Sequence, residues 1–388
     1  MISAWRSTLR SWSGSSSQCI VEKNVVSGKV WEEFCDTLKA AGANLKFPGA
    51  PQDPFHQAEG YRYLARLTRT ALDAFVEHGD VSYPVLNRMV HETAKLGADN
   101  PDNFYQNARI SGSHDYVLKG NRNSVFYLGF FTQKGGYGSS GNLESTGVLE
   151  DGDYFFAEDG SIEIILSKTK PPQGNWLPIE EESNLLIVRQ TFLDKEAEIP
   201  AELTIECLNP GQEKQPLTPI QLKDGLEQAS LFVAGAPLLF ARWAKGFKSH
   251  ANQLPTFDPE VNRKMGGVDS ITYYHSYWAL NDHESLIIHV TPPECPYWNF
   301  QLNNYWMESL DYRYFRIHLN KSSAWYNPDG SVDIIVAHAD PGHPNWINTC
   351  HHREGTMCFR WSKAAQPVQP QTKVISFEEA VRQYGQKP

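Results

Sequence analysis

An internal repeat is the feature that most constrains the fold of this chain. Residues 159–165, DGSIEII, return at residues 329–335 as DGSVDII, an offset of 170 positions. The same offset places the Asn175–Trp176 pair on the Asn345–Trp346 pair without a gap. Self-similarity at a fixed spacing indicates repeated structural units. The chain should therefore contain two related modules. Positions that agree between the copies reflect shared architecture, whereas chemistry present in only one copy indicates a candidate site.

The order of secondary-structure signals predicts an α+β fold. Apolar residues recur at near-helical spacing in residues 28–102, whereas residues 103–207 hold short β-branched and aromatic runs between Gly, Asn, Asp and Pro clusters. Residues 218–262 and 263–365 repeat this order. Because helices and strands are segregated rather than alternating, a parallel α/β sheet is disfavoured. We expect two related antiparallel β-sandwich or jelly-roll-like modules, each preceded by a helical block.

Shorter segments complete the expected organisation. Residues 1–27 are Ser-rich with Arg6 and Arg10, which predicts a flexible leader with a faint likeness to an organelle transit peptide. Residues 208–217 are expected to form a linker, and residues 366–388 a tail with a short helix. The run DYFFA at 153–157 is expected to be a strand, and the Gly-rich run at 135–141 a flexible loop.

Composition excludes several classes of function. The 388-residue chain has a net charge of −10 and no basic run, so nucleic-acid binding is not expected. No stretch reaches the roughly 18 apolar residues of a membrane span, so the chain should not cross a membrane. The six cysteines show neither a CxxC pair nor zinc spacing. Free thiols in a reducing compartment, hence a cytoplasmic location, are the expectation.

The second copy carries ionisable residues that the first copy lacks. His338 and Asp340 stand where the first copy has lysines, and residues 351–354, HHRE, follow the shared Asn-Trp pair. His352 and Glu354 are two apart, so on a strand they would share a face and form an imidazole–carboxylate pair suited to acid–base catalysis. The alternative is that these histidines are loop residues with satisfied hydrogen bonds.

Metal binding is not expected from these histidines. His351 and His352 are adjacent and would point to opposite faces of a strand. The chain contains neither an HExxH motif nor a recognisable facial triad. No cofactor is expected either.

A second pair of carboxylates, Glu308 and Asp311, lies in the segment NYWMESLDYRYF. Two carboxylates can divide acid and base roles when their environments differ. The alternative is a solvated turn or a salt bridge to Arg313 or Arg316.

Residues 297–303 alternate between aromatic or apolar residues and amides, which predicts a strand with one apolar and one amide-rich face. Amides with nearby aromatic rings suit a small organic ligand, although aromatic residues at this density can also be core. Arg360 corresponds to Arg189 of the first copy if one residue is inserted. The candidate substrate-binding residues are Trp298, Gln301, Asn303, Trp306, Tyr312 and Arg360.

Residues 269–363, including PPECPYWNFQLNNYWMESLDYRYFRIHLN and the DGSVDII repeat, closely resemble the domain-of-unknown-function family numbered 1214. The first module resembles a more diverged relative. The resemblance implies a β-rich, jelly-roll-like fold with helical additions, and it implies no reaction. His351 stands where the family pattern has Gly, which favours His352 over His351 as a functional residue.

These observations favour a metal-independent enzyme of hydrolase, lyase or isomerase type. It would act by acid–base chemistry on a small, largely apolar organic substrate in an aromatic and amide-lined pocket of the second module. The alternative is a non-catalytic glycan- or lipid-binding protein with a Trp/Tyr stacking platform. The expected partner is a small organic molecule, and a homodimer is left open.

Overall fold

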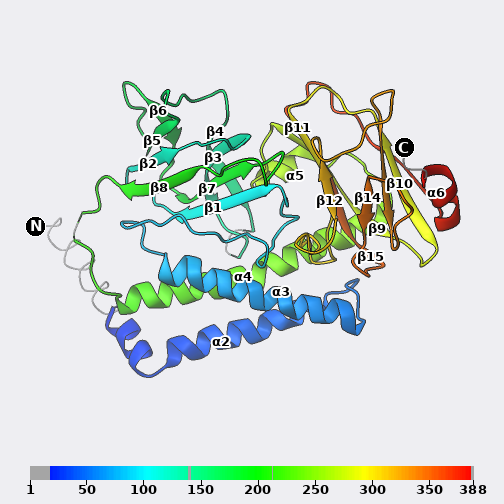
Figure 1. The fold of residues 1–388 in the computed structure, drawn as a ribbon. Helices are drawn as coiled ribbons and strands as arrows, with labels where there is room; N and C mark the ends of the chain where they lie inside the picture. Colours follow the sequence, from blue (N-terminus) through cyan, green and yellow to red (C-terminus); the bar gives the residue numbers. More distant parts are fainter. Residues whose placement is uncertain (1–17, 139–140, 212, 386–388) are drawn as a thin grey trace, which may run out of the picture.

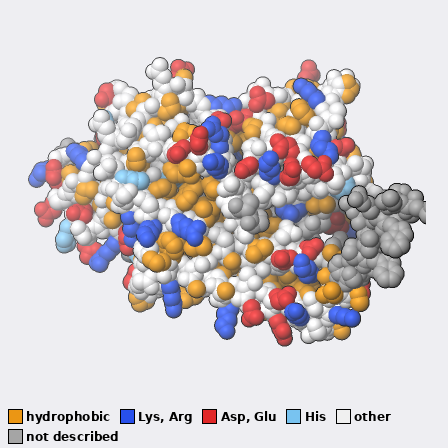
Figure 2. Space-filling view, turned by 180° about the vertical axis from the view of Figure 1, so that it is seen from behind, with side chains coloured by type: hydrophobic (Ala, Val, Ile, Leu, Met, Phe, Trp, Pro, Cys, Tyr) orange, Lys and Arg blue, Asp and Glu red, His pale blue; other side chains and the backbone are white. Residues whose placement is uncertain are grey.

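The computed structural model describes residues 18–138, 141–211 and 213–385. Two β modules lie side by side above a layer of helices (Figure 1). Seen from the opposite side, hydrophobic side chains gather near the middle of the molecule, where the modules adjoin (Figure 2). Residues 1–17 of the expected leader lie outside the described residues, whereas residues 18–26 are helical.

The helical layer comes from the two segments that precede the modules. Asp53 caps one helix by accepting hydrogen bonds from the backbone N–H groups of Phe55 and His56. Thr218 and Gln221 form a reciprocal capping box at the start of another. The helices are α2 (Lys29–Ala41), α3 (Pro54–Leu72), α4 (Pro219–Phe247) and the short α5 (Pro259–Lys264).

The first module consists of two four-stranded sheets. The inner sheet has the order β1 (Asn103–Arg109), β7 (Ser183–Thr191), β3 (Tyr127–Gly135) and β4 (Leu143–Leu149). The outer sheet has the order β6 (Asn175–Pro178), β5 (Ser161–Ser167), β2 (Tyr116–Asn121) and β8 (Glu202–Cys207). Apolar residues from both sheets, such as Leu118 and Val188, pack together between them.

The second module repeats this arrangement. Its inner sheet has the order β9 (Ile271–Ala279), β15 (Glu354–Ser362), β11 (Tyr297–Leu302) and β12 (His318–Asn320). Its outer sheet has the order β14 (Trp346–Asn348), β13 (Val332–Ala337), β10 (Glu284–Val290) and β16 (Gln371–Ser376). The helix α6 (Phe377–Tyr384) covers part of the outer sheet.

The predicted α+β fold with two related sandwich modules is confirmed, with three differences in detail. The sheets are not wholly antiparallel, because β5 pairs with β6, and β13 with β14, in parallel. Residues 153–157 form no strand, since turns at 151–152 and 158–159 enclose this run. The expected tail contributes β16, which pairs with β10 as β8 pairs with β2.

The shared Asn-Trp pair is part of the scaffold in both copies. Asn175 bonds through its side chain to the backbone N–H and C=O of Phe155 and to the C=O of Glu163. Asn345 makes the same three bonds to Trp325 and Asp333. The pair therefore closes a loop onto the neighbouring strand, as the repeat led us to expect.

The helices share a core with the second module. Residues of α2, α3 and α4 pack in one buried cluster with Tyr277, Trp306 and Cys358 of that module. The side chain of Tyr305 donates to the C=O of Ala241 in α4 at 3.1 Å. This shared core holds α4 beneath both inner sheets (Figure 1).

Candidate functional site

A cavity of about 400 Å³ lies between the two modules and against α4. Because side chains alternate across a strand, each inner sheet turns one face to its sandwich core and the other to this cavity. On β7, Val188 lies in the core while Arg189 lines the cavity. On β15, Phe359 and Trp361 lie in the core while Arg360 lines the cavity.

The repeat places equivalent residues on the two sides of the cavity. Tyr105 of β1 is paired in register with Arg189, and Tyr273 of β9 is paired with Arg360. All four residues line the cavity. The strand register thus confirms the correspondence of Arg189 and Arg360, and each module contributes one tyrosine–arginine pair.

Arg360 is buried, with 5% of its surface exposed, and hydrogen bonds to three residues hold its guanidinium in place. Its Nη1 donates to Gln301 Oε1 at 2.6 Å and to Asn299 Oδ1 at 3.2 Å, and its Nη2 donates to the C=O of Ala98. All three acceptors are uncharged. Within the described part of the chain, no carboxylate oxygen lies within 4.0 Å of the guanidinium of Arg360, Arg189 or Arg109.

His275 is a second polar group of the cavity wall. Its ring is stacked on the ring of Tyr273, with centroids 5.3 Å apart, and on Phe247 at 6.0 Å. Burial, followed by the charge of Arg360, lowers the pKa of His275 to about 3. The imidazole is therefore neutral at physiological pH, and it can exchange hydrogen bonds but is a weak base.

Several buried polar atoms of the cavity residues lack a hydrogen-bond partner. They include His275 Nδ1, Asn107 Oδ1 and Gln133 Oε1. Asn107 and His275 are equivalent in the two copies, since each lies two residues beyond the paired tyrosine. These atoms are themselves buried and not exposed to the cavity, so a bound molecule would reach them only if a side chain shifted.

Burial shifts the pKa values of three titratable groups of the cavity upward. Burial raises the pKa of Tyr137 to about 12 and that of Tyr297 well above its usual value. Burial also raises the pKa of Asp99, whose carboxylate accepts hydrogen bonds from Ser309. The arrangement favours recognition of a ligand over proton transfer at this cavity.

The predicted catalytic residues lie outside the lining of this cavity. His352 does not pair with Glu354; its Nε2 lies 2.7 Å from Oε2 of Glu59 in α3. Glu354 instead accepts hydrogen bonds from Tyr277 and Lys248. The expected pairing required both residues on one strand, but β15 begins at Glu354 and His352 lies in the preceding turn.

His338 and Asp340 are not brought to His352 by hydrogen bonds. Nδ1 of His338 lies 2.8 Å from the hydroxyl oxygen of Thr349. Asp340 is exposed, and its carboxylate accepts a hydrogen bond from the backbone N–H of Gly342. Both contacts are consistent with the alternative that these are loop residues with satisfied hydrogen bonds.

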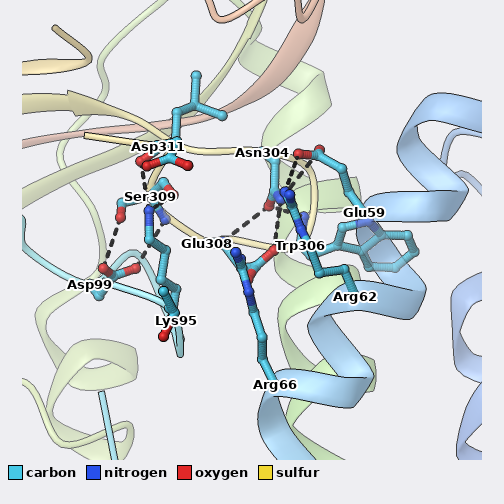
Figure 3. A network of polar contacts seen from close by, with 12 residues as sticks. Glu59, Arg62, Arg66, Lys95, Asp99, Asn304, Trp306, Glu308, Ser309 and Asp311 are labelled. Atoms are coloured by element: carbon cyan, nitrogen blue, oxygen red, sulfur yellow. Dashed lines mark hydrogen bonds and ion pairs between the residues drawn. The ribbon is translucent and has the colours of Figure 1, made fainter. Parts of the chain in front are cut away.

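Glu308 and Asp311 belong to a polar network between the second module and α3 (Figure 3). Glu308 accepts from Arg66 Nη1 at 2.6 Å and from Asn304. Burial raises the pKa of Glu308, and the charge of Arg66 opposes that rise. Asp311 is bound through two hydrogen bonds by Arg313, as the salt-bridge alternative proposed. The two carboxylates thus have separate arginine partners.

The predicted substrate-binding residues divide into two groups. Arg360 lines the cavity, whereas Gln301 lies outside the lining, where it accepts from Arg360 and donates to Asn303. Trp298 and Trp306 are fully buried, so neither ring offers the exposed stacking platform that the alternative hypothesis required. The reason is that Trp298 points to the apolar face of β11 and packs on Phe359 in the sandwich core.

Tyr312 lies outside the cavity lining, with the ammonium of Lys95 4.4 Å from its ring centroid. Sequence reasoning missed Tyr105, Tyr273, His275 and Arg189 as site residues. The correspondence of Arg189 and Arg360 was the signal that could have found them. The predicted Gly-rich loop contributes Tyr137 to the cavity, while its residues 139–140 lie outside the described residues.

Two further features can be stated for residues 18–138, 141–211 and 213–385. No group of three His, Cys, Asp or Glu side chains there is arranged to hold a metal ion. No helix in these ranges has the length and apolar character needed to cross a membrane.

The fold and the site define a duplicated β-sandwich protein with a cavity between its two copies. The family model described as "Protein of unknown function (DUF1214)" matches residues 105–192 and 279–366. A solved structure of an uncharacterized protein from Burkholderia cenocepacia is 49% identical, with a TM-score of 0.90; the match covers 92% of this chain and 99% of that one. The chain therefore belongs to the DUF1214 family.

A second solved structure, of a protein from Vibrio parahaemolyticus, is 10% identical with a TM-score of 0.46. That match covers 82% of this chain and 98% of the other. No curated protein matches the chain.

Proposed function

We propose that the protein binds a small organic acid, with a carboxylate and an aromatic or aliphatic body, in the cavity between its modules. The observation that carries this proposal is Arg360, a buried guanidinium in the cavity wall with only uncharged oxygen acceptors. Asp99 of the same lining acts on Arg360 through its charge but does not contact it, and a ligand carboxylate would supply a direct partner through strong hydrogen bonds.

The shape and lining of the cavity support a small-molecule ligand. Its volume of about 400 Å³ falls within the range of roughly 300–1,000 Å³ typical of ligand pockets. Phe240 and Trp243 of α4 and Tyr273 of β9 supply aromatic surface for the body of the ligand. An amide-bearing strand beside an aromatic wall was the pattern expected for the second module, and Gln301 fits it by orienting Arg360.

Isothermal titration calorimetry tests the proposal. The ligands are benzoate and phenylacetate, compared with their uncharged counterparts benzamide and phenylacetamide. We expect a carboxylate to bind about tenfold or more tightly than its amide, because a charged hydrogen bond contributes about 1.5–3 kcal/mol. Arg360→Gln should remove this difference. Arg242→Gln, on the exposed side of α4, is the matched control and should leave it unchanged.

Because Arg360 is buried, the circular dichroism of Arg360→Gln must match that of the wild type. Arg360→Lys, which keeps the charge, should retain part of the carboxylate preference. Carboxylates and amides that bind the wild-type protein equally well would contradict the proposal.

Acid–base catalysis, the function favoured by the sequence, is the second candidate. One observation favours it, a buried contact of 2.7 Å between the imidazole of His352 and the carboxylate of Glu59. The sequence had predicted Glu354 as the partner of His352. Phe55 flanks the imidazole with ring centroids 4.7 Å apart. We propose this pair, which lies outside the cavity lining, as the acid–base group for a carboxylate that is altered chemically at a separate place.

Mass spectrometry of a bound carboxylate after incubation separates the two functions. A product whose mass change is lost in His352→Asn, but kept in the control His338→Asn, would establish catalysis at the His352–Glu59 pair. An unaltered ligand supports the binding function.

We also propose a cytoplasmic location, which the six free cysteines support because they fit a reducing compartment. The homodimer stays a prediction. Light scattering coupled to size-exclusion chromatography would check it.

A further inference from the structure

We infer that the cavity binds a two-ended anion, most simply a dicarboxylate, with one end at Arg360 and the other at Arg189. This inference rests on the proposed function and specifies the ligand class. Its starting point is that the duplicated fold brings the same residue of both copies to one cavity.

The two arginines lie at the same position of equivalent strands. Each is flanked on one side by a tyrosine, Tyr105 or Tyr273. On the other side, the register of β3 places Gly129 beside Arg189, and the register of β11 places Asn299 beside Arg360. Each copy thus contributes one guanidinium to the lining of the cavity.

Both guanidiniums lie close enough to one phenol to act on it. Burial raises the pKa of Tyr105, and the charges of Arg189 and Arg360 both oppose that rise. Tyr105 belongs to the first module, so the charge of Arg360 acts on a residue of the other copy. Both arginines line the same cavity of about 400 Å³, so a single small molecule that fills it would contact both.

The two arginines differ in how firmly the protein holds them. Asn299 and Gln301 hold Arg360, but Gly129 and Phe131 occupy the equivalent positions in the first copy and offer no amide. Among the described residues, Arg189 donates a hydrogen bond to the C=O of Gly266 at 2.9 Å and lies 4.6 Å from the Phe131 ring centroid. Arg360 is the fixed end of the site, and Arg189 keeps N–H donors for a ligand.

The charge of the lining fits a dianion better than a monoanion. The chain as a whole has a net charge of −10, yet four cationic and two anionic side chains line the cavity. Four cations less two anions leave an excess of two positive charges in the lining; the charge of Asp99 acts on Arg360, and Asp151 also pairs with Arg122. The remaining excess of positive charge is matched by two carboxylates.

The surface between the two arginines sets the character of the ligand's middle part. Phe240, Trp243 and Tyr137 form an aromatic wall that suits a hydrocarbon or aromatic spacer. The equivalent residues Asn107 and His275 add polar side chains to the lining, but their unpartnered atoms are buried.

Calorimetry tests this inference. The ligands are straight-chain dicarboxylates, terephthalate, and monocarboxylates of the same lengths. At the best chain length, we expect the dicarboxylate to bind about tenfold or more tightly than the matched monocarboxylate, the gain from one further charged hydrogen bond. Arg189→Gln should abolish this gain, so that the dicarboxylate binds no more tightly than the matched monocarboxylate. Arg242→Gln should preserve both affinities.

Each outcome decides between the two proposals. Equal affinity for mono- and dicarboxylates in the wild type, or an unchanged preference in Arg189→Gln, would overturn the two-ended ligand while the proposed function stands. If none of the carboxylates binds the wild type, neither the monocarboxylates nor terephthalate and the other dicarboxylates, both the proposed function and the two-ended ligand are overturned. If Arg189→Gln fails to fold, the wild-type comparison still decides, and Arg189→Lys should retain part of the dicarboxylate preference.

Discussion

At the scale of single residues, the His352–Glu59 contact illustrates a long-range partner that no local pattern reveals. The imidazole and the carboxylate are 293 positions apart in the sequence. Burial by itself would raise the pKa of Glu59, but the hydrogen bond and charge of His352, together with the charges of Arg62 and His56, outweigh it and hold that pKa below its usual value. Glu59 therefore stabilises the folded state as a carboxylate.

This contact predicts a pH dependence of stability. Because the folded-state pKa of Glu59 is lowered, its contribution is present above the unfolded pKa of 4.5 and is lost as the pH falls through the folded value. Glu59→Gln should cost about 3 kcal/mol at neutral pH, since it breaks a buried pair. It should also flatten the fall in stability below about pH 5. Urea unfolding at a series of pH values measures both effects.

Glu158→Gln, at an exposed position, is the matched control and should follow the wild-type pH curve. If the stability of Glu59→Gln fell at low pH as steeply as that of the wild type, the His352 contact would not stabilise the fold.

Asn175 and Asn345 show what single residues did reveal in advance. Their role could be predicted because the same residue recurs at one offset and makes the same local bonds in each copy. Arg360 was also identified as a candidate, because its counterpart Arg189 was visible in the alignment of the copies. The cavity partners Tyr105 and Tyr273 gave no such signal, since tyrosines at these positions equally suit a core.

At the scale of elements, the end of the chain belongs to the second module. The strand β16 extends the outer sheet beside β10, and α6 packs Ala380 against Ile287 and Ile335. The short helix was expected from the sequence, but the strand was not. Its residues, QTKVIS, alternate too weakly to be distinguished from a polar linker without the neighbouring strand.

Ala380→Arg should detach α6 from the sheet. Ala380 is fully buried, so a large charged side chain there would be strained and desolvated, at a cost of about 2 kcal/mol or more. Urea unfolding and limited proteolysis near residue 377 would detect the loss. Gln383→Arg, exposed on the same helix, should have little effect. Equal stability of the two variants would mean that this contact contributes little.

At the scale of the whole molecule, the second module depends on the helical layer. Tyr277, Trp306 and Cys358 belong to the second module but are buried among residues of α2, α3 and α4. The polar network of Figure 3 adds charged contacts across the same boundary, including Arg66 to Glu308. Without the helical layer, the second module would therefore expose apolar side chains that are buried in the full chain.

Residues 263–388 expressed alone should consequently fail to form a stable monomer, because large apolar side chains would be exposed. The full chain should unfold in one cooperative transition. Calorimetry of the full chain and size-exclusion chromatography of the fragment measure these expectations. A monomeric fragment with a sharp melting transition would contradict them.

The sequence by itself determined the duplication, the sandwich class and the scaffold roles of the repeated residues, because these depend on local periodicity and short-range turns. Only the tertiary structure decided where a ligand could bind. The cavity exists because the inner sheets of the two copies and α4 border the same space, which brings Arg189 and Arg360 into one lining. The same packing gave Glu308 and His352 ion-pair partners from distant segments. Asp311, in contrast, pairs with Arg313 in its own turn. Contacts between distant segments depend on the closure of the whole chain, and no local sequence pattern encodes them.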